Sequence, residues 1–203
     1  LASCAVETPS EDILYEVGAV EGYVLVGGQG VPLTVSARLL RPEGDWTSNT
    51  VRAETRSDST GWYRLEMPVG RYLLFLHSSG SGNSQADTVQ IEPVVLRHDL
   101  RRGQAMVRLR MPLEWEGLYC DLRLDNVTNN YYGRDGDGIE DGWAEFVMPA
   151  LEPGAYVMEF TPPNSYDSIY LPGTLDAAEA DTLVVGLDAV AGYERDFTGT
   201  YIT

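Results

Sequence analysis

The stretch Gly61-Trp62-Tyr63-Arg64-Leu65-Glu66-Met67-Pro68 decides the fold, because the chain repeats it as Gly142-Trp143-Ala144-Glu145-Phe146-Val147-Met148-Pro149. A Gly and a Tyr follow each copy, in Gly70-Arg71-Tyr72 and in Gly154-Ala155-Tyr156. An internal repeat of this length indicates two tandem copies of one small domain. In a chain of 203 residues, each copy has about 90–100 residues, which is enough for a hydrophobic core of its own.

Apolar and polar residues alternate along both copies, which predicts strands with one buried and one solvated face. Tyr63, Leu65 and Met67 form the apolar set in the first copy, and Ala144, Phe146 and Met148 form it in the second. Clusters of Gly, Ser, Asp and Pro separate these short segments, as turns do. The sequence therefore predicts an all-β protein of two tandem antiparallel β-sandwiches. A single helical turn is predicted at residues 175–180.

The domain organisation follows from the repeat. Residues 1–12 form an N-terminal tether, residues 13–102 the first sandwich and residues 103–203 the second. Arg101-Arg102-Gly103 is too short to act as a free linker. We therefore expect the two domains to touch and to form a semi-rigid rod.

A family resemblance supports this fold. Residues 58–65 and 67–72, in the sequence Asp-Ser-Thr-Gly-Trp-Tyr-Arg-Leu and Met-Pro-Val-Gly-Arg-Tyr, resemble the D-x-x-G-x-Y-x-F and L-P-x-G-x-Y core of carboxypeptidase regulatory-like domains. Residues 141–146 and 151–156 resemble the same motifs in the second copy. The resemblance implies two Ig-like, transthyretin-like seven-stranded sandwiches. It implies a fold and an accessory role on secreted or surface proteins, and it brings no catalytic residues.

The charge excludes several partners. The formal net charge is −17, and all 14 basic residues are Arg. Such a chain repels nucleic acid and anionic lipid, because it cannot neutralise their phosphates. Without Lys, Schiff-base chemistry is excluded.

The N-terminus resembles the end of a bacterial lipoprotein signal. Leu1-Ala2-Ser3-Cys4 matches a lipobox, in which the Cys receives the lipid, and a polar tether follows it. This predicts a lipid anchor on Cys4, an extracytoplasmic location and, with Ala5 after the Cys, the bacterial outer membrane or cell surface. The alternative is a disulfide between Cys4 and Cys120. Cys120 alternates in phase with Leu122 and Leu124, which favours a buried, unpaired thiol.

One acidic loop has the character of a metal site. Asp135, Asp137 and Asp141 match a D-x-D-G-x-x-D calcium loop, in which Gly permits a tight backbone and carboxylates supply the oxygens that Ca²⁺ prefers. Asp141-Gly142 also has the sequence of an ordinary hairpin turn that needs no metal. We expect no other cofactor.

Aromatic residues are the candidate ligand contacts. Trp46, Tyr131 and Tyr132 lie in predicted loops, where they can stack on a sugar or anchor a protein. Trp62 and Trp143 lie on the solvated faces of their strands, and their repetition favours packing between the domains or under a loop. For His98, which continues an apolar alternation, a core or edge position is the expectation.

These observations predict a non-enzymatic, lipid-anchored surface module that acts as a spacer or binding domain. Three alternatives stay open. The first is a carbohydrate-binding module that uses the three loop aromatics. The second is a self-assembling surface or filament subunit in which an edge strand such as Ile13–Val20 pairs with a neighbour. The third is a hydrolase that uses two carboxylates.

Overall fold

The computed structural model describes residues 16–40, 51–77, 86–128 and 132–198. Within these segments the regular secondary structure is β-strand, apart from two short 3-10 turns, η1 (Leu113–Trp115) and η2 (Ala177–Glu179). The all-β fold predicted from the sequence is confirmed, and η2 lies where a helical turn was expected. None of the helical turns in the described segments has the length and apolarity that crossing a membrane requires.

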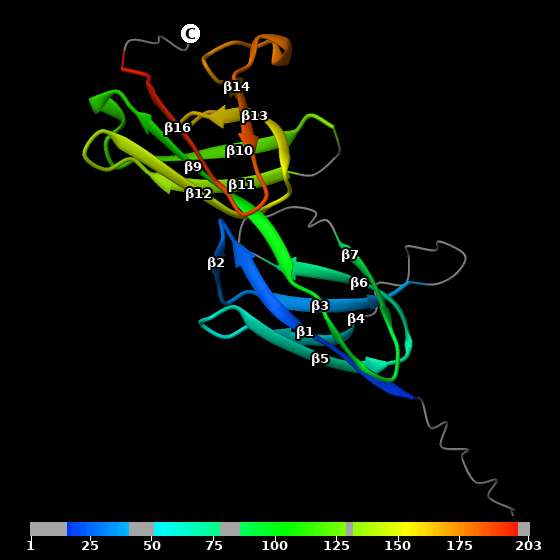
Figure 1. Cartoon of the computed structure of the whole chain (residues 1–203). Helices are drawn as coiled ribbons and strands as arrows, with labels where there is room; N and C mark the ends of the chain where they lie inside the picture. The colour runs from blue at the N-terminus through cyan, green and yellow to red at the C-terminus, as the bar shows by residue number, and fades with distance from the viewer. Residues whose placement is uncertain (1–15, 41–50, 78–85, 129–131, 199–203) are drawn as a thin grey trace, which may run out of the picture.

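The first half of the chain forms a two-layered sandwich (Figure 1). In one sheet, β1 (Val17–Val26) lies between antiparallel β5 (Trp62–Pro68) and parallel β8 (Val95–Arg97), and β2 (Gln29–Gly30) pairs with its end. The facing sheet has the order β4-β3-β6-β7. Its strands are β3 (Thr34–Leu39), β4 (Val51–Arg56), β6 (Gly70–His77) and β7 (Asp87–Ile91).

The second half repeats this arrangement, except that it has no counterpart of β2 and has the additional strand β14. The long β9 (Leu100–Arg110) lies between antiparallel β12 (Trp143–Leu151) and parallel β16 (Val190–Asp196), as β1 lies between β5 and β8. The facing sheet has the order β11-β10-β13, with β14 and β15 both paired to β13. Its strands are β10 (Tyr119–Asn126), β11 (Tyr132–Gly138), β13 (Gly154–Thr161), β14 (Ile169–Tyr170) and β15 (Thr182–Val185).

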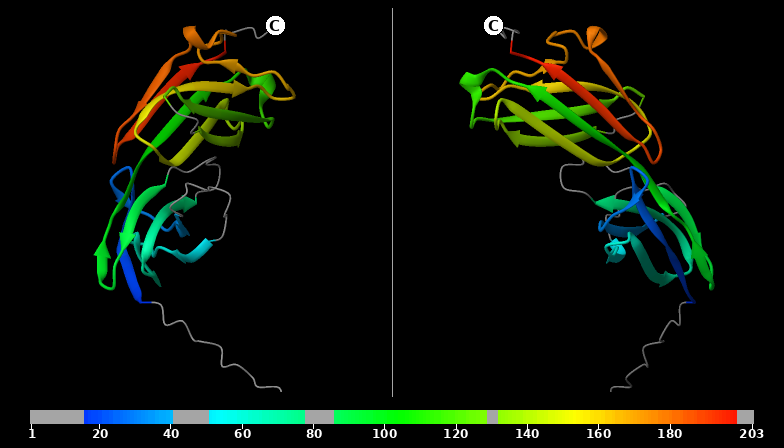
Figure 2. Two further views of the ribbon diagram at one scale, coloured as in Figure 1. Left: turned by 90° about the vertical axis from the view of Figure 1, so that its right-hand side faces the viewer. Right: turned by 60° about the vertical axis from the view of Figure 1, so that its left-hand side comes forward.

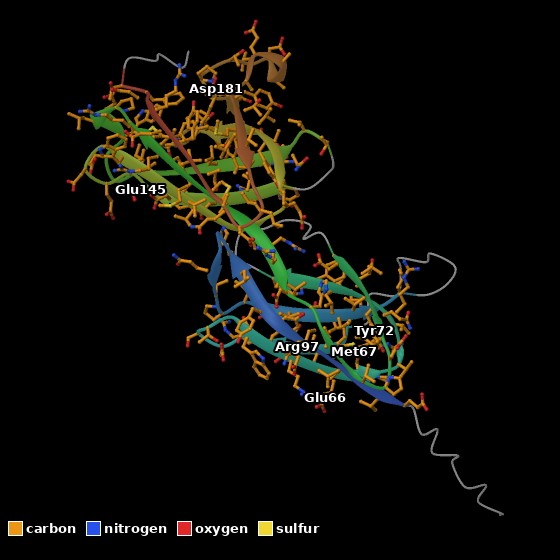
Figure 3. The ribbon with its side chains drawn as sticks, viewed as in Figure 1. Glu66, Met67, Tyr72, Arg97, Glu145 and Asp181 are labelled. Atoms are coloured by element: carbon orange, nitrogen blue, oxygen red, sulfur yellow. The ribbon has the colours of Figure 1, made fainter. Side chains whose placement is uncertain are left out.

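Each half has its own hydrophobic core. The first core extends to Leu100 and the second begins at Ala105. The predicted apolar sets occupy equivalent places in the two cores, since Leu65 pairs with Val20 of β1 and Phe146 pairs with Val107 of β9. All six side chains are at most 3% exposed: Tyr63, Leu65, Met67, Ala144, Phe146 and Met148. In Figure 3, Met67 and Tyr72 belong to the first core, whereas the labelled neighbour Glu66 is exposed.

The two sandwiches also share an equivalent hydrogen bond from a buried tyrosine. The hydroxyl group of Tyr72 donates to the carbonyl of Pro68 (2.9 Å), and that of Tyr156 donates to the carbonyl of Glu152 (2.7 Å). Both rings are buried, so each hydroxyl needs this acceptor. The motif resembles a tyrosine corner, which fixes the start of a strand against the preceding turn.

The two halves are joined more closely than by a short connection. Residues 101–103, which are too short for a free linker, lie inside β9, which runs through them as a single strand (Figures 1 and 2). Its first residues, Leu100 to Arg102, pair in parallel with Val24 to Val26 of β1, so one seven-stranded sheet joins the sandwiches. Among the described strands, three pairs are parallel, namely β1–β8, β1–β9 and β16–β9. The seven-stranded sheet is therefore mixed, whereas the two facing sheets are antiparallel throughout.

Candidate functional site

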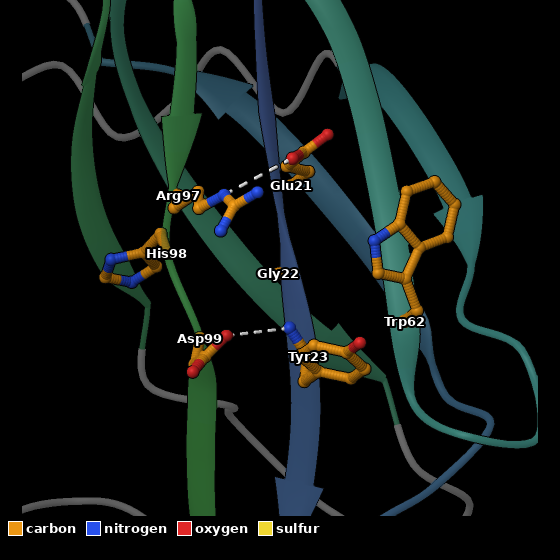
Figure 4. Close-up of a pocket in the computed structure, with 7 residues that line it drawn as sticks. All are labelled: Glu21, Gly22, Tyr23, Trp62, Arg97, His98 and Asp99. Carbon is orange, nitrogen blue, oxygen red and sulfur yellow. Dashed lines mark hydrogen bonds and ion pairs between the residues drawn. The ribbon is translucent and has the colours of Figure 1, made fainter.

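A concave pocket on the outer face of the first sandwich is the candidate ligand site. Its volume is about 310 Å³, within the range of small-ligand pockets. β1 and β5 supply one side of it, and the connection from β8 to β9 supplies the other (Figure 4). The side chains that line it are Glu21, Tyr23, Trp62, Arg97, His98 and Asp99.

Two aromatic rings stand next to each other in this pocket. Tyr23 of β1 and Trp62 of β5 are register partners, and their side chains are on the solvent-facing side of the sheet. Directly opposite residues on neighbouring strands have Cβ atoms about 4.5–5.5 Å apart. Tyr23 is 45% exposed and Trp62 is 40% exposed. The pair therefore offers an open aromatic surface.

An interruption in the strand pairing beside β1 positions Asp99 at the polar side of the pocket. β8 pairs with β1 as far as Glu21, and pairing resumes with β9 at Val24. In the gap, the Asp99 carboxylate accepts a hydrogen bond from the Tyr23 N–H (2.9 Å) in place of a backbone carbonyl. A Cβ atom at Gly22 would lie 2.1 Å from the carbonyl oxygen of His98, so a residue with a side chain would force the two strands apart there.

The charges beside the pocket are balanced. Glu21 lies between two Arg residues, with its carboxylate oxygens 3.2 Å from Nη1 of Arg64 and 3.6 Å from Nε of Arg97. The Arg97 side chain is 89% exposed, so most of its guanidinium donors face solvent. The site therefore combines an aromatic surface with both donors and acceptors of hydrogen bonds.

The equivalent surface of the second sandwich also has a pocket, of about 400 Å³ and lined by Trp143 and Arg110, but its aromatic side is built differently. Trp143 occupies the place of Trp62, but Arg110 stands opposite it instead of a tyrosine. The guanidinium of Arg108 lies 4.7 Å from the centroid of the Trp143 ring, a cation–π contact that covers the indole. The repetition of the two tryptophans favoured a shared packing role, and the structure gives them different surroundings.

The ion pairs around this second tryptophan have the opposite charge pattern. Arg108 lies between Glu145 (2.9 Å) and Glu194 (3.3 Å), whereas the equivalent Glu21 lies between two arginines. A cross-strand pair of opposite charges is equally favourable whichever strand carries the acidic residue. These ion pairs therefore stabilise both sheets, although only the first sandwich has the aromatic pair beside them.

A buried ion-pair network joins the two sandwiches. The Arg102 side chain, 6% exposed, has Nη2 2.8 Å from Oδ1 of Asp87 in the first sandwich and Nε 2.8 Å from Oε1 of Glu152 in the second. The other Asp87 oxygen lies 2.9 Å from Nε2 of His98. His98 is therefore a partly exposed edge residue with an acidic partner, in agreement with an edge position.

The network shifts its two carboxyl groups in opposite directions. For Asp87, burial favours the neutral form, but the hydrogen bonds and charges of His98 and Arg102 outweigh burial and lower the pKa. For Glu152, burial dominates over the attraction of Arg102 and raises the pKa, with a further contribution from Asp87. Arg102 therefore lies between Asp87, whose environment favours the charged form, and Glu152, whose environment favours the neutral form.

In this structure, two of the three aspartates of the acidic loop accept hydrogen bonds from backbone N–H groups. Asp135 Oδ2 accepts a hydrogen bond from the Val147 N–H (2.7 Å), and Asp137 Oδ2 accepts one from the Glu145 N–H (2.8 Å). Asp141 lies at the hairpin turn with φ 53°, next to Gly142 with φ 74°, and both φ values are typical of a type I′ turn. Within the described ranges, no group of three or more His, Cys, Asp or Glu residues could hold a metal ion. The D-x-D spacing instead places two carboxylates on one side of β11, where they cover the free edge of β12.

The other predicted site residues do not gather in the pocket. Cys4, Trp46 and Tyr131 lie outside the described residues. Tyr132 lies on β11, with the guanidinium of Arg123 4.7 Å from its ring centroid. Cys120 is buried and unpaired, as its alternation predicted.

The strand proposed for self-assembly is not an edge strand. Ile13 to Tyr15 lie outside the described residues, but from Val17 to Val20 the chain forms part of β1. β5 pairs with β1 on one side from Val17 on, and β8 pairs with it on the other from Ala19. From Ala19 on, both hydrogen-bonding edges are therefore occupied within the chain, so this part of the segment is not available to a neighbour.

A serine–histidine contact in the first sandwich is not a nucleophilic site. Ser36 Oγ lies 2.6 Å from Nε2 of His77, but Ser36 is 0% exposed. A nucleophile has to reach its substrate. The contact instead satisfies a buried hydroxyl group.

Comparisons with known proteins give only distant likenesses. No family model and no curated protein matches the chain. Among similar solved structures, the Bacillus anthracis TIE protein is 13% identical, with a TM-score of 0.36 over 89% of this chain and 33% of that one. A streptococcal ancillary pilin is 12% identical, with a TM-score of 0.36 over 77% of this chain and 59% of that one. A DUF3823 family protein from Parabacteroides merdae is 12% identical, with a TM-score of 0.34 over 78% of this chain and 97% of that one.

These values limit what the likenesses mean. The chain spans a third of the TIE protein and less than two thirds of the ancillary pilin. With such low identities and TM-scores, none of the three carries an argument about the activity or partners of this protein.

Proposed function

We propose that this protein is a non-enzymatic surface module outside the cytoplasm, in which two sandwiches act as one stiff spacer that presents a ligand pocket. The observation that carries the proposal is the continuity of β9 through both sandwiches. A strand hydrogen-bonded in both halves cannot bend as a free linker does. Domain pairs joined in this way keep a fixed separation, which a spacer requires.

Contacts beside β9 add to this stiffness. Arg102 joins Asp87 to Glu152 inside the junction. At the surface, Arg101 forms an ion pair with Asp188, in the loop that precedes β16. The Gly27 N–H at the end of β1 also donates to the Arg102 carbonyl (3.0 Å). Bending at the junction therefore breaks a buried ion-pair network as well as a strand pair.

Distances between spin labels test the spacer. Ser59→Cys and Asp167→Cys, in a Cys4→Ser background, put one label in each sandwich at exposed positions. We expect a single narrow distance distribution in the otherwise unchanged chain, and a broader one with Arg102→Ala. Arg97→Ala is the matched control, because its ion pair with Glu21 lies within the first sandwich. A broad distribution in the unchanged chain would contradict a stiff spacer.

For the anchor, we propose that Cys4 carries a lipid that holds the spacer at a bacterial membrane surface. The lipobox-like sequence Leu1-Ala2-Ser3-Cys4 and the polar residues that follow it support this. The test is metabolic labelling with an alkynyl fatty acid in bacteria that express the whole gene product. Label that is lost with Cys4→Ser supports the anchor, and a protein that is never labelled overturns it.

A carbohydrate-binding module is the second candidate function. The specific observation in its favour is the exposed pair Tyr23 and Trp62, beside charged groups that can bond to hydroxyls. These residues differ from the loop aromatics that the sequence indicated. A carbohydrate-binding module and a spacer are compatible, because one sandwich can bind while both hold the site away from the membrane.

A further inference from the structure

We propose that the pocket between Tyr23, Trp62, Arg97 and Asp99 binds a neutral oligosaccharide of pyranose units with equatorial hydroxyls. The inference rests on the proposed role as a binding module and names the ligand class of its pocket. It is carried by three features of the first sandwich, namely an open aromatic pair, balanced polar groups and a built break in the sheet. The second sandwich lacks the aromatic pair, since Trp143 lies opposite Arg110 and against Arg108.

The aromatic pair matches the apolar face of a pyranose ring. Pyranose units with equatorial hydroxyls present C–H groups on their flat faces and hydroxyls around their rims. An indole or phenol ring takes up such a face by burying apolar area, and its electron-rich surface attracts the C–H hydrogens. Tyr23 and Trp62 are register partners with partly exposed rings, so one sugar unit can cover either ring and a linked unit can cover the other.

The polar groups match the rim of the ring. The Arg97 guanidinium is mostly exposed and donates hydrogen bonds, whereas the exposed Asp99 and the Glu21 carboxylate supply acceptors. Sugar hydroxyls donate and accept, so a site with both kinds of group suits them. Glu21 is already held by Arg64 and Arg97, which reduces the entropy lost when a ligand binds.

The position of Asp99 is built into the backbone. Its carboxylate replaces a missing carbonyl by accepting the Tyr23 N–H, and the close approach of His98 to Gly22 keeps the two strands in this register. The buried hydroxyl of Tyr63 donates to the His98 carbonyl (2.7 Å) and fixes the break from below. The pocket is therefore preorganised, because its aromatic side lies on strands and Asp99 lies in a two-residue connection that hydrogen bonds hold in place.

Charge decides between neutral and anionic sugars. The whole chain carries −17, whereas Glu21 and Asp99 at the pocket are balanced by Arg64 and Arg97 and leave no excess positive charge for an anion. An anionic saccharide meets repulsion from the molecule as it approaches. A neutral sugar meets no such electrostatic repulsion.

The second sandwich provides an internal control. Trp143 has the same topological position as Trp62, but Arg108 covers its ring and Arg110 replaces the tyrosine. If any exposed tryptophan sufficed, both positions would bind. The geometry predicts binding at Trp62 alone.

Calorimetric titration of the full chain tests the proposal, with cellohexaose, xylohexaose and chitohexaose as neutral probes and hexagalacturonate as the anionic probe. We expect at least one neutral probe to bind and the anionic probe not to bind. Trp62→Ala and Tyr23→Ala should each weaken binding about 10-fold or more, as the loss of a central aromatic contact does. Trp143→Ala and Arg110→Ala should leave the dissociation constant unchanged. The thermal midpoint of each variant shows that it is folded.

Three outcomes overturn the proposal: no binding of any neutral probe at millimolar concentration, binding of the anionic probe alone, or binding that survives Trp62→Ala in a folded protein. The spin-label distances separate this failure from failure of the spacer. A narrow distance distribution without sugar binding supports the stiff spacer and contradicts the oligosaccharide pocket. A broad distribution with sugar binding contradicts the stiff spacer and supports the oligosaccharide pocket.

Discussion

Arg102 and Glu152 meet across the boundary between the two sandwiches, with Nε of the arginine 2.8 Å from Oε1 of the glutamate and both side chains largely buried. The same guanidinium lies 2.8 Å from Asp87 in the first sandwich. One cation thus compensates a carboxylate from each half of the chain. This arrangement makes the junction sensitive to any change at Arg102, since its removal leaves two acidic groups without their positive partner.

Removing the arginine should destabilise the protein strongly. We expect Arg102→Ala to lower the free energy of unfolding by about 3–5 kcal/mol, the usual cost of breaking a buried ion pair from one side. Arg97→Ala is the control, because its ion pair is exposed and contributes less than about 1 kcal/mol. Urea unfolding monitored by fluorescence measures both. Equal, small effects would show that the junction tolerates the uncompensated carboxylates.

The acid dependence of stability should differ between the two carboxyl groups of the network. The pKa of Asp87 is lowered in the folded state, so its contribution is present above its unfolded pKa of about 4 and is lost as the pH falls through the folded value. The stability difference between the unchanged protein and Asp87→Asn should therefore be constant at neutral pH and shrink in acid.

The pH dependence that Glu152 contributes to stability has the opposite sign to that of Asp87. Its pKa is raised in the folded state, so the folded protein binds the proton more tightly, and this contribution is lost as the pH rises through the folded pKa. Relative to Glu152→Gln, the unchanged protein should gain stability as the pH falls toward the ordinary value for a glutamate. Urea unfolding over a pH series measures both differences, and identical profiles for the two variants would contradict the assignment.

The two aspartates of β11 should stabilise the edge of β12 without metal. Asp135→Ala and Asp137→Ala each remove a charged acceptor of a backbone N–H, which should cost about 1–3 kcal/mol. The Asn variants keep an acceptor oxygen and should lose less. The melting midpoint should be the same in chelator, calcium and magnesium, and a rise in calcium alone would restore the calcium-loop interpretation.

The thiol of Cys120 should be inert in the folded protein. Burial, followed by the nearby charges of Asp137 and Asp121, raises its pKa to about 12, so the reactive thiolate is scarce at ordinary pH. In a Cys4→Ser background, a disulfide reagent at about pH 8 should modify nothing until urea is added. Rapid modification without urea would show that the second core opens readily.

The paired tyrosines should contribute equally and independently. Tyr72→Phe and Tyr156→Phe each remove one buried hydroxyl that donates to a backbone carbonyl, at a cost of about 0.5–1.5 kcal/mol. Because the two rings belong to separate cores, the double variant should show the sum of the single effects. A clear departure from additivity in urea unfolding would reveal coupling between the sandwiches at these positions.

The sequence by itself determined the repeated unit and its buried face. The parity of Tyr63, Leu65 and Met67, repeated at Ala144, Phe146 and Met148, predicted which side of each strand enters a core, and all six are buried. A strand alternates its side chains with a period of two, so local pattern is sufficient for this. The same reasoning placed Cys120 inside.

Only the tertiary structure decided what happens between strands and between domains. The shortness of residues 101–103 indicated that the domains touch, but only the pairing of residues 100–102 with β1, far earlier in the chain, showed that they belong to one continuous strand. Asp135 and Asp137 read as metal ligands, but the N–H groups of β12 lie within their reach once the two sheets pack. The surroundings of Trp62 likewise depend on Tyr23 and on the interruption of the sheet at Asp99. The equivalent Trp143 instead lies against the Arg108 guanidinium. Such partners are set by register and sheet packing, which depend on contacts between segments distant in the chain, and no local pattern encodes them.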